Sequence, residues 1–207
     1  GTPESYTYKN LTLNSRIVAT FTGAMLFLDV RRADWFYSDV RYVVEHGLFH
    51  GTTQELFSPN APMTRGMLVT VLYRLAGSPK SAADSGFADV AAGKYYADAV
   101  SWAAENGIVS GVSDGCFAPD SQVTREQLAA ILYRYARDKR YDTGKTADLM
   151  GFADYGQISG YAAEALGWTN AEGLVSGRSK TALSPQGSAT RAEVAAILHR
   201  FAENVAK

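Results

Sequence analysis

The sequence predicts a mostly helical single domain with pseudo-threefold symmetry, and three observations lead to this prediction. One amphipathic helical segment occurs three times, at residues 64–76, 124–136 and 190–202. Each copy closes a repeat of about 50 residues that also carries a shorter segment with one apolar face. Two short helices with one apolar side each cannot bury those sides within a single unit. We therefore expect three copies to pack their apolar stripes together around a common axis.

The composition bounds the possible functions. The 207 residues include 20 basic and 21 acidic side chains, and a net charge of −1 argues against a nucleic-acid-binding surface. A hydrophobic content of 46% is enough for a packed core. The chain has no apolar run of 18 residues, so we expect no membrane insertion. We also expect no cofactor, and the single Cys116 excludes an internal disulfide.

The chain divides into an N-terminal segment, three repeats and two linkers. In residues 1–26, apolar side chains recur at mostly alternate positions, which indicates one or two β-strands. The repeats are 27–77, 87–137 and 152–203, and the polar linkers between them are 78–86 and 138–151. Repeat three carries one extra residue, which we place within residues 155–160.

The first half of each repeat has a fixed order of parts. It opens with a Phe-x-Asp motif, an aromatic residue follows, and a first helix then runs to a glycine. In repeat two we expect this helix over residues 95–106, because Asn106-Gly107 is a good C-terminal stop. The aspartates are Asp29, Asp89 and Asp154, and the aromatic residues are Trp35, Tyr95 and Tyr161.

The second half of each repeat leads into the recurring helix. A second glycine (Gly51, Gly111 and Gly177) precedes a loop with an apolar-x-Pro motif, and Thr-Arg follows. In repeat two, Thr124 and Gln127 form a capping box, so the helix begins at Thr124. Repeat one has Gly66-Met67 after its Thr-Arg, so we expect its capping box to be lost.

The arginine after each capping threonine is the most informative residue for function. A helix N-terminus carries partial positive charge and unpaired N–H groups, so a cation there is unfavourable by about 0.3–1 kcal/mol. Arg65, Arg125 and Arg191 all take this position. Three arginines in register indicate that each shares an anionic partner with its helix end. The alternative is an arginine that is solvated or paired with an aspartate of its own repeat.

This combination of motifs resembles the S-layer homology domain. The family pattern is roughly F-x-D-[VY], W, a helix ending in N-G-[IL], then G, F-x-P and T-R-[AE]-E. Repeat two matches it most closely, with Phe87-Ala88-Asp89-Val90, Asn106-Gly107-Ile108, Gly111, Phe117-Ala118-Pro119 and Thr124-Arg125-Glu126-Gln127. Repeat three ends in Thr190-Arg191-Ala192-Glu193, the most frequent form of the motif. The three copies cover about 150 residues of the chain.

The resemblance implies both a fold and a role. Triplets of these domains form a three-pronged spindle around a central three-helix bundle of Thr-Arg helices. They anchor exported bacterial proteins to the cell wall, so the chain would be secreted and located at the cell surface, with an effector region elsewhere in the parent protein. The usual partner is a secondary cell-wall polysaccharide, a glycan linked to peptidoglycan. Its pyruvate ketals are bound in grooves between repeats.

Site residues carry over by position in the motif. Arg65, Arg125 and Arg191 would bind the ketal carboxylate, the three aromatic residues would stack on sugars, and the three aspartates would accept hydrogen bonds from sugar hydroxyls. Gly51, Gly111 and Gly177 would allow the backbone to approach the ligand. The alternatives are a turn or cap for the aspartates, core packing for the aromatics and a plain turn for the glycines. We expect the grooves of Arg65 and Arg125 to function before that of Arg191.

Two other functions remain open at this point. A structural or adhesion module would bind protein partners in a surface lattice. A wall-glycan hydrolase would need two carboxylates about 5–10 Å apart in one cleft, and no unique pair stands out in the repeats. The histidines His46, His50 and His199 are scattered, so we expect neither a catalytic nor a metal site.

Overall fold

The computed structural model describes residues 27–81 and 84–206, and within them the regular structure is helical. The predicted strands of residues 1–26 lie outside the described residues. The helices are α1 (Tyr37–Glu45), α2 (Arg65–Leu75), α3 (Ala97–Glu105), α4 (Arg125–Asp138), the 3₁₀ helices η1 (Tyr155–Gln157) and η2 (Gly160–Ala162), α5 (Ala163–Ala171) and α6 (Arg191–Asn204).

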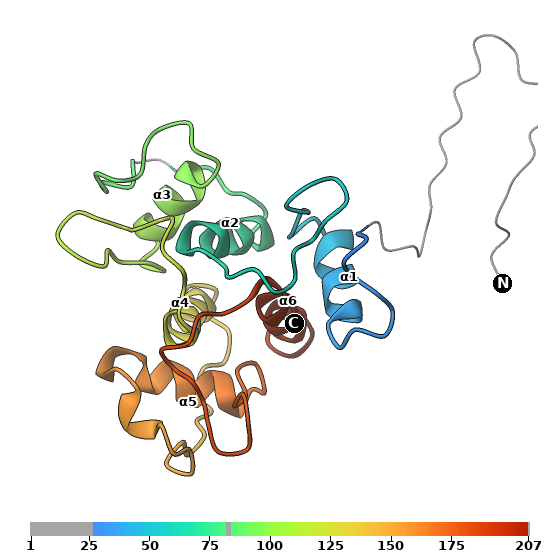
Figure 1. The fold of residues 1–207 in the computed structure, drawn as a ribbon. Coiled ribbons are helices and arrows are strands. Elements are labelled where there is room, and N and C mark those ends of the chain that lie inside the picture. The colour runs from blue at the N-terminus through green and yellow to red at the C-terminus, as the bar shows by residue number, and fades with distance from the viewer. Residues whose placement is uncertain (1–26, 82–83, 207) are drawn as a thin grey trace, which may run out of the picture.

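The three Thr-Arg helices α2, α4 and α6 lie at the centre of the molecule, and α1, α3 and α5 lie outside them (Figure 1). This arrangement confirms the predicted mostly helical, pseudo-threefold domain. The first helix of repeat two is shorter than expected, because it begins at Ala97 rather than at residue 95. In repeat three the segment expected to hold the extra residue forms η1.

Each central helix packs against the first helix of the next repeat, not of its own. The main helix pairs are α2 with α3, α4 with α5, and α6 with α1, so the last repeat returns to the first and closes a ring. An aromatic contact recurs at equivalent places in these pairs: Tyr73 with Trp102, Tyr133 with Trp168, and His199 with Tyr42, at ring-centroid separations of 5.6, 5.5 and 4.0 Å.

A closed cycle of backbone hydrogen bonds marks the pseudo-threefold axis. Met63 N donates to Ala189 O over 2.9 Å, Ala189 N donates to Val123 O over 3.0 Å, and Val123 N donates to Met63 O over 2.9 Å. All three side chains are fully buried. Each residue immediately precedes a capping threonine, so the cycle fixes where the three central helices begin relative to one another.

The helix caps agree with the sequence. Thr124 and Thr190 form complete capping boxes with Gln127 and Glu193. Thr64 accepts only the Met67 N–H, because Met67 cannot return a hydrogen bond. Repeat one therefore keeps its helix start but loses the reciprocal half of the cap, as predicted.

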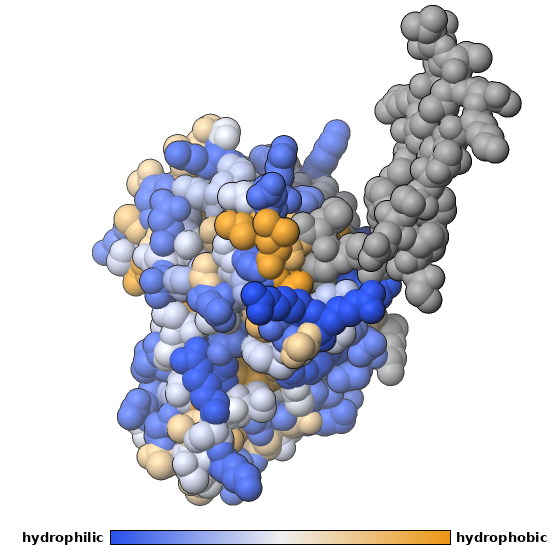
Figure 2. Space-filling model, turned by 45° about the vertical axis from the view of Figure 1, so that its right-hand side comes forward, coloured by the Kyte–Doolittle hydropathy of each residue, from blue (hydrophilic) through white to orange (hydrophobic). Residues whose placement is uncertain are grey.

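The apolar faces of the helices are buried in one cluster that extends through all three repeats. On the face drawn in Figure 2, most of the surface is hydrophilic, and hydrophobic residues gather in one small area. Among the described residues, no helix combines the length and the apolar character needed to cross a lipid bilayer.

Because the repeats pack on one another in a ring, we expect the domain to unfold as one unit. Leu166→Ala removes a fully buried side chain of α5 and should lower the free energy of unfolding by about 2–5 kcal/mol. Hydrogen exchange followed by mass spectrometry should show that protection falls by a similar amount in α1, α3 and α5. A loss of protection confined to repeat three would contradict this cooperativity.

Candidate functional site

Three grooves occupy equivalent places around the axis, and all three repeats contribute to each one. A groove combines the Thr-Arg arginine of one repeat, the loop and central helix of the next, and the exposed aromatic residue of the remaining repeat. We name them by their arginines. The Arg65 groove (Ser110, Gly111, Val112, Gln127, Arg134, Tyr161) encloses about 360 Å³, the Arg125 groove (Trp35, Ser176, Gly177, Arg178, Glu193, Arg200) about 220 Å³, and the Arg191 groove (His50, Gly51, Met67, Thr70, Arg74, Tyr95) about 210 Å³.

The three groove arginines are buried and bonded to the loop of the following repeat. Arg65 Nε donates to Phe117 O over 2.8 Å, and its Nη2 donates to Ser110 O over 3.2 Å. The guanidinium lies over the Phe117 ring, 4.6 Å from its centroid. Arg125 and Arg191 repeat this pattern, with bonds to Leu183 O and Ser176 O and to Phe57 O and His50 O.

This geometry excludes the alternative to an anionic partner that the sequence left open for the three arginines. The arginines are neither solvated nor paired with an aspartate of their own repeat. Burial is the main cause that lowers the pKa of Arg65, Arg125 and Arg191 below the ordinary value for arginine. In each case the aspartate of the following repeat opposes this shift electrostatically: Asp89, Asp154 and Asp29 respectively.

The helix ends also differ from the expectation that their free N–H groups would help to bind an anion. Arg65 N donates to Ser121 O over 2.9 Å, and Gly66 N donates to Pro119 O over 2.8 Å. The next N–H, of Met67, donates to the hydroxyl of Thr64. Equivalent bonds occur at the starts of α4 and α6. The neighbouring loop has already satisfied these donors, so a ligand would meet side chains rather than a helix terminus.

The three aspartates order the loops of their own repeats. The Asp89 carboxylate accepts the N–H of Phe117 over 2.8 Å and that of Ala118 over 2.7 Å. Ala118 has φ of 56°, a left-handed conformation that is strained for a non-glycine residue. Asp29 and Asp154 make the same two bonds to Phe57 and Ser58 and to Leu183 and Ser184.

The three glycines are required by close contacts within the loops. A Cβ at Gly51 would lie 2.2 Å from the carbonyl oxygen of Thr53. At Gly111 and Gly177 the nearest backbone oxygens, of Cys116 and Ser179, would be 2.7 and 2.5 Å away. These residues also line the grooves, so the tight turn brings loop backbone to the groove wall.

The aromatic residues are exposed, which excludes the core-packing alternative. Trp35, Tyr95 and Tyr161 are 62%, 60% and 54% accessible, and each lies in a different groove. In the Arg65 groove, the Tyr161 hydroxyl donates to Glu126 Oε1 over 3.1 Å, which fixes the orientation of the ring. Burial and the neighbouring Glu126 raise the pKa of Tyr161 to about 12, so this donor persists at neutral pH.

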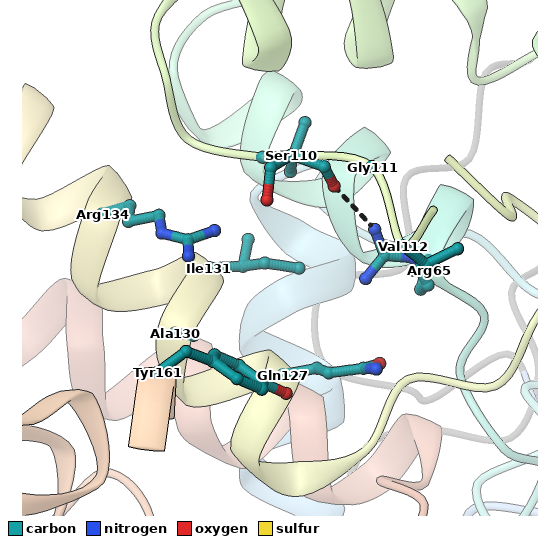
Figure 3. A pocket seen from close by; sticks show the side chains of 10 residues that line it. Arg65, Ser110, Gly111, Val112, Gln127, Ala130, Ile131, Arg134 and Tyr161 are labelled. Carbon is teal, nitrogen blue, oxygen red and sulfur yellow. Dashed lines mark hydrogen bonds between the residues drawn. The ribbon is translucent and has the colours of Figure 1, made fainter. Parts of the chain in front are cut away.

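A second arginine in every groove was missed by the sequence interpretation. Arg74, Arg134 and Arg200 each follow the first arginine of their own central helix by nine residues. Arg74 and Arg200 donate to loop carbonyl oxygens, whereas Arg134 has no hydrogen bond or ion pair within the described chain. Figure 3 shows Arg134 extending into the Arg65 groove from α4. The second arginine recurs at the same position of all three repeats, so the comparison of repeats that identified the first arginine could also have identified the second.

The grooves differ in charge at one equivalent helix position. This position is occupied by Met67 in the Arg191 groove, by Gln127 in the Arg65 groove and by Glu193 in the Arg125 groove. The Glu193 carboxylate accepts from Arg178 over 3.1 Å and lies 3.9 Å from Arg125 Nη1. The sequence analysis expected the Arg65 and Arg125 grooves to function equally well and before the Arg191 groove. The carboxylate of Glu193 now distinguishes the Arg125 groove from the Arg65 groove.

Comparison with known families gives one match that recurs along the chain. The model of the S-layer homology domain matches residues 26–66, 86–129 and 151–195. These three segments include the Phe-x-Asp motifs, the loops and the starts of the central helices.

Curated relatives show a similar sequence within longer proteins. A surface-layer 125 kDa protein from Lysinibacillus sphaericus is 32% identical over 169 residues, which cover 80% of this chain and 14% of the relative. An amylopullulanase from Thermoanaerobacterium thermosulfurigenes is 30% identical over 190 residues, 89% of this chain and 10% of the relative. A cellulosome-anchoring protein from Acetivibrio thermocellus is 27% identical over 165 residues, 77% of this chain and 36% of the relative. The chain thus spans far less than two thirds of these relatives.

The close contacts around the loop glycines predict a large effect of a small substitution. In Gly51→Ala, the new methyl group would collide with loop backbone, so the free energy of unfolding should fall by about 1–3 kcal/mol. Gly151→Ala is the matched control, because nothing lies within 4 Å of its added Cβ. Urea denaturation of both variants measures the difference. Equal stability of the two variants would show that the Gly51 turn relaxes freely.

The aspartate bonds predict loss of stability in acid. Backbone N–H donors, that of Leu183 first, lower the pKa of Asp154 below its ordinary value. Because the folded pKa is depressed, the stabilisation is present above the unfolded pKa of about 3.9 and is lost as pH falls through the folded pKa. Asp154→Asn should therefore be less stable than wild type at pH 7, and the difference should shrink below pH 4. Urea midpoints between pH 3 and 7 measure this, and a constant difference would contradict it.

Proposed function

Since this chain belongs to the family of S-layer homology domains, we propose that it is a non-catalytic module that anchors an exported bacterial protein to the cell surface. In this proposal it binds a secondary cell-wall polysaccharide in the grooves between repeats. The observation that carries the proposal is the repeated pairing of an exposed aromatic ring with at least two arginines in each groove. An aromatic face suits the apolar side of a sugar, and arginine suits a carboxylate.

The Arg65 groove is the strongest candidate for an anionic sugar. Arg65 uses Nε and Nη2 for loop carbonyls, which leaves Nη1 without a hydrogen-bond partner among the described residues. Arg134 adds a second guanidinium, which has no hydrogen bond or ion pair to residues 27–81 or 84–206, and Gln127 in the same groove is uncharged. A carboxylate such as that of a pyruvate ketal would gain charge-assisted hydrogen bonds from both cations. Tyr161 would place its ring against the sugar.

The remaining motif residues have a supporting role in this proposal. Asp29, Asp89 and Asp154 hold the loops through two backbone N–H groups each, and Gly51, Gly111 and Gly177 let those loops turn tightly. We therefore assign them to groove shape rather than to sugar contacts. The first arginines both hold the neighbouring loop and present charge to the groove, whereas the second arginines are more exposed to a ligand.

Arg134→Ala tests the proposal, because it removes a groove cation that makes no hydrogen bond or ion pair in the fold described here. Co-sedimentation with purified bacterial wall sacculi, before and after acid stripping of the attached polysaccharide, measures binding. Wild type should sediment only with unstripped walls. The variant should lose about 1.5–3 kcal/mol of binding free energy, the value of a charged hydrogen bond.

Arg137→Ala provides the matched control. Arg137 lies on the same helix and is exposed outside the groove residues, so its loss removes the same charge from the protein without changing the site. Wild-type binding that is equal on stripped and unstripped walls would refute the glycan proposal and favour a protein partner. Equal losses in the two variants would show that net charge, not the groove, drives association.

A further inference from the structure

Gln127 in α4 and Glu193 in α6 occupy equivalent positions in two grooves, but only Glu193 carries a charge. Each residue forms the reciprocal half of a capping box, with Gln127 Oε1 accepting from Thr124 N over 3.3 Å and Glu193 Oε2 accepting from Thr190 N over 3.1 Å. Both side chains line their grooves. The shared cap holds them in equivalent positions, so the main difference between them is an amide against a carboxylate.

The carboxylate of Glu193 already lies near two of the three arginines of its groove, Arg125 and Arg178. The third, Arg200, donates to Gly173 O over 3.3 Å and to Leu174 O over 3.4 Å. Arg178 Nη2 donates to both carboxylate oxygens of Glu193, over 3.1 and 3.2 Å, and also to Ser188 O over 2.7 Å. Arg125 Nη1 lies 3.9 Å from Glu193 Oε2. In the Arg65 groove the residue equivalent to Arg178 is Val112, so neither member of this ion pair is present there.

We infer that Glu193 determines the specificity of the Arg125 groove, which accepts uncharged sugars and rejects sugars that bear a carboxylate. An anionic ligand entering this groove would meet a fixed negative charge, and it would have to compete with that charge for Arg125 and Arg178. An uncharged sugar can stack on Trp35 without that competition. The Arg65 groove, with Gln127 at the same place, accepts the carboxylate. This inference rests on the proposed function, because it assumes that the grooves bind glycan.

The chain offers a reciprocal, nearly isosteric test. Glu193→Gln removes the negative charge from the Arg125 groove, and Gln127→Glu adds one to the Arg65 groove. Either residue can complete a capping box, so the fold should be preserved. Unchanged thermal midpoints would verify this. Glu193→Gln also removes the ion-pair partner of Arg178. The double variant Glu193→Gln/Arg178→Val therefore rebuilds the Val112–Gln127 pair of the Arg65 groove.

The probe is a methyl mannoside that carries a pyruvate ketal, and its methyl ester serves as the uncharged control. Site-resolved NMR titration separates the grooves, with the Gly111 amide reporting the Arg65 groove and the Gly177 amide reporting the Arg125 groove. In wild type the acid should perturb Gly111, and the ester should perturb Gly177. Glu193→Gln and the double variant should strengthen acid binding at Gly177 at least tenfold. Gln127→Glu should weaken it at Gly111 at least tenfold, with ester binding unchanged within twofold.

The outcomes distinguish this inference from the proposed function. If the acid binds both grooves of wild type equally, the specificity assigned to Glu193 is wrong while glycan binding stands. The same conclusion follows if neither Glu193→Gln nor Gln127→Glu changes the affinity for the acid at Gly177 or Gly111. If neither acid nor ester perturbs either glycine in wild type, the glycan proposal fails for this class of ligand, and the inference fails with it.

Discussion

The buried guanidinium at the start of each central helix is the interaction on which the rest of the structure depends. It reaches across to the following repeat and donates to two carbonyl oxygens of that repeat's loop, as Arg65 does to Phe117 and Ser110. A buried cation is unfavourable unless its donors are satisfied, so the loop must present those carbonyls at fixed positions. The aspartate bonds, the left-handed residue and the tight glycine turn together give the loop that shape.

The same contacts link folding to the grooves. Each central helix packs on the next repeat, and the pairing of α6 with α1 closes the ring. A groove is therefore lined by three repeats that are far apart in sequence, and it exists only when the ring is complete. The cycle of hydrogen bonds among Met63, Val123 and Ala189 keeps the three grooves equivalent in position. Their chemistry differs through individual side chains, such as Val112 and Arg178 in the loops and Gln127 and Glu193 in the central helices.

Much of the candidate site could be predicted because each of its parts is repeated. Three arginines, three aromatics and three glycines in register identified the residues that line the grooves, and the caps of Thr124 and Thr190 were predicted correctly. The helix termini were interpreted wrongly as free anion sites, because sequence cannot show that Ser121 O and Pro119 O already accept their N–H groups. The second arginines were overlooked although they obey the same register.

The sequence by itself determined the number of repeats, the helices, their apolar faces and the residues that recur at each groove. Periodicity encodes which face of a helix is apolar, and caps encode where a helix begins. Only the tertiary structure decided which neighbour covers that face, because several helices with the same stripe are equally suitable partners by pattern alone. The preference for the next repeat follows from long-range contacts: Arg125 with the loop of repeat three, and Arg191 with that of repeat one. These contacts also decide that Glu193 shares a groove with Arg125 while Arg134 shares one with Arg65.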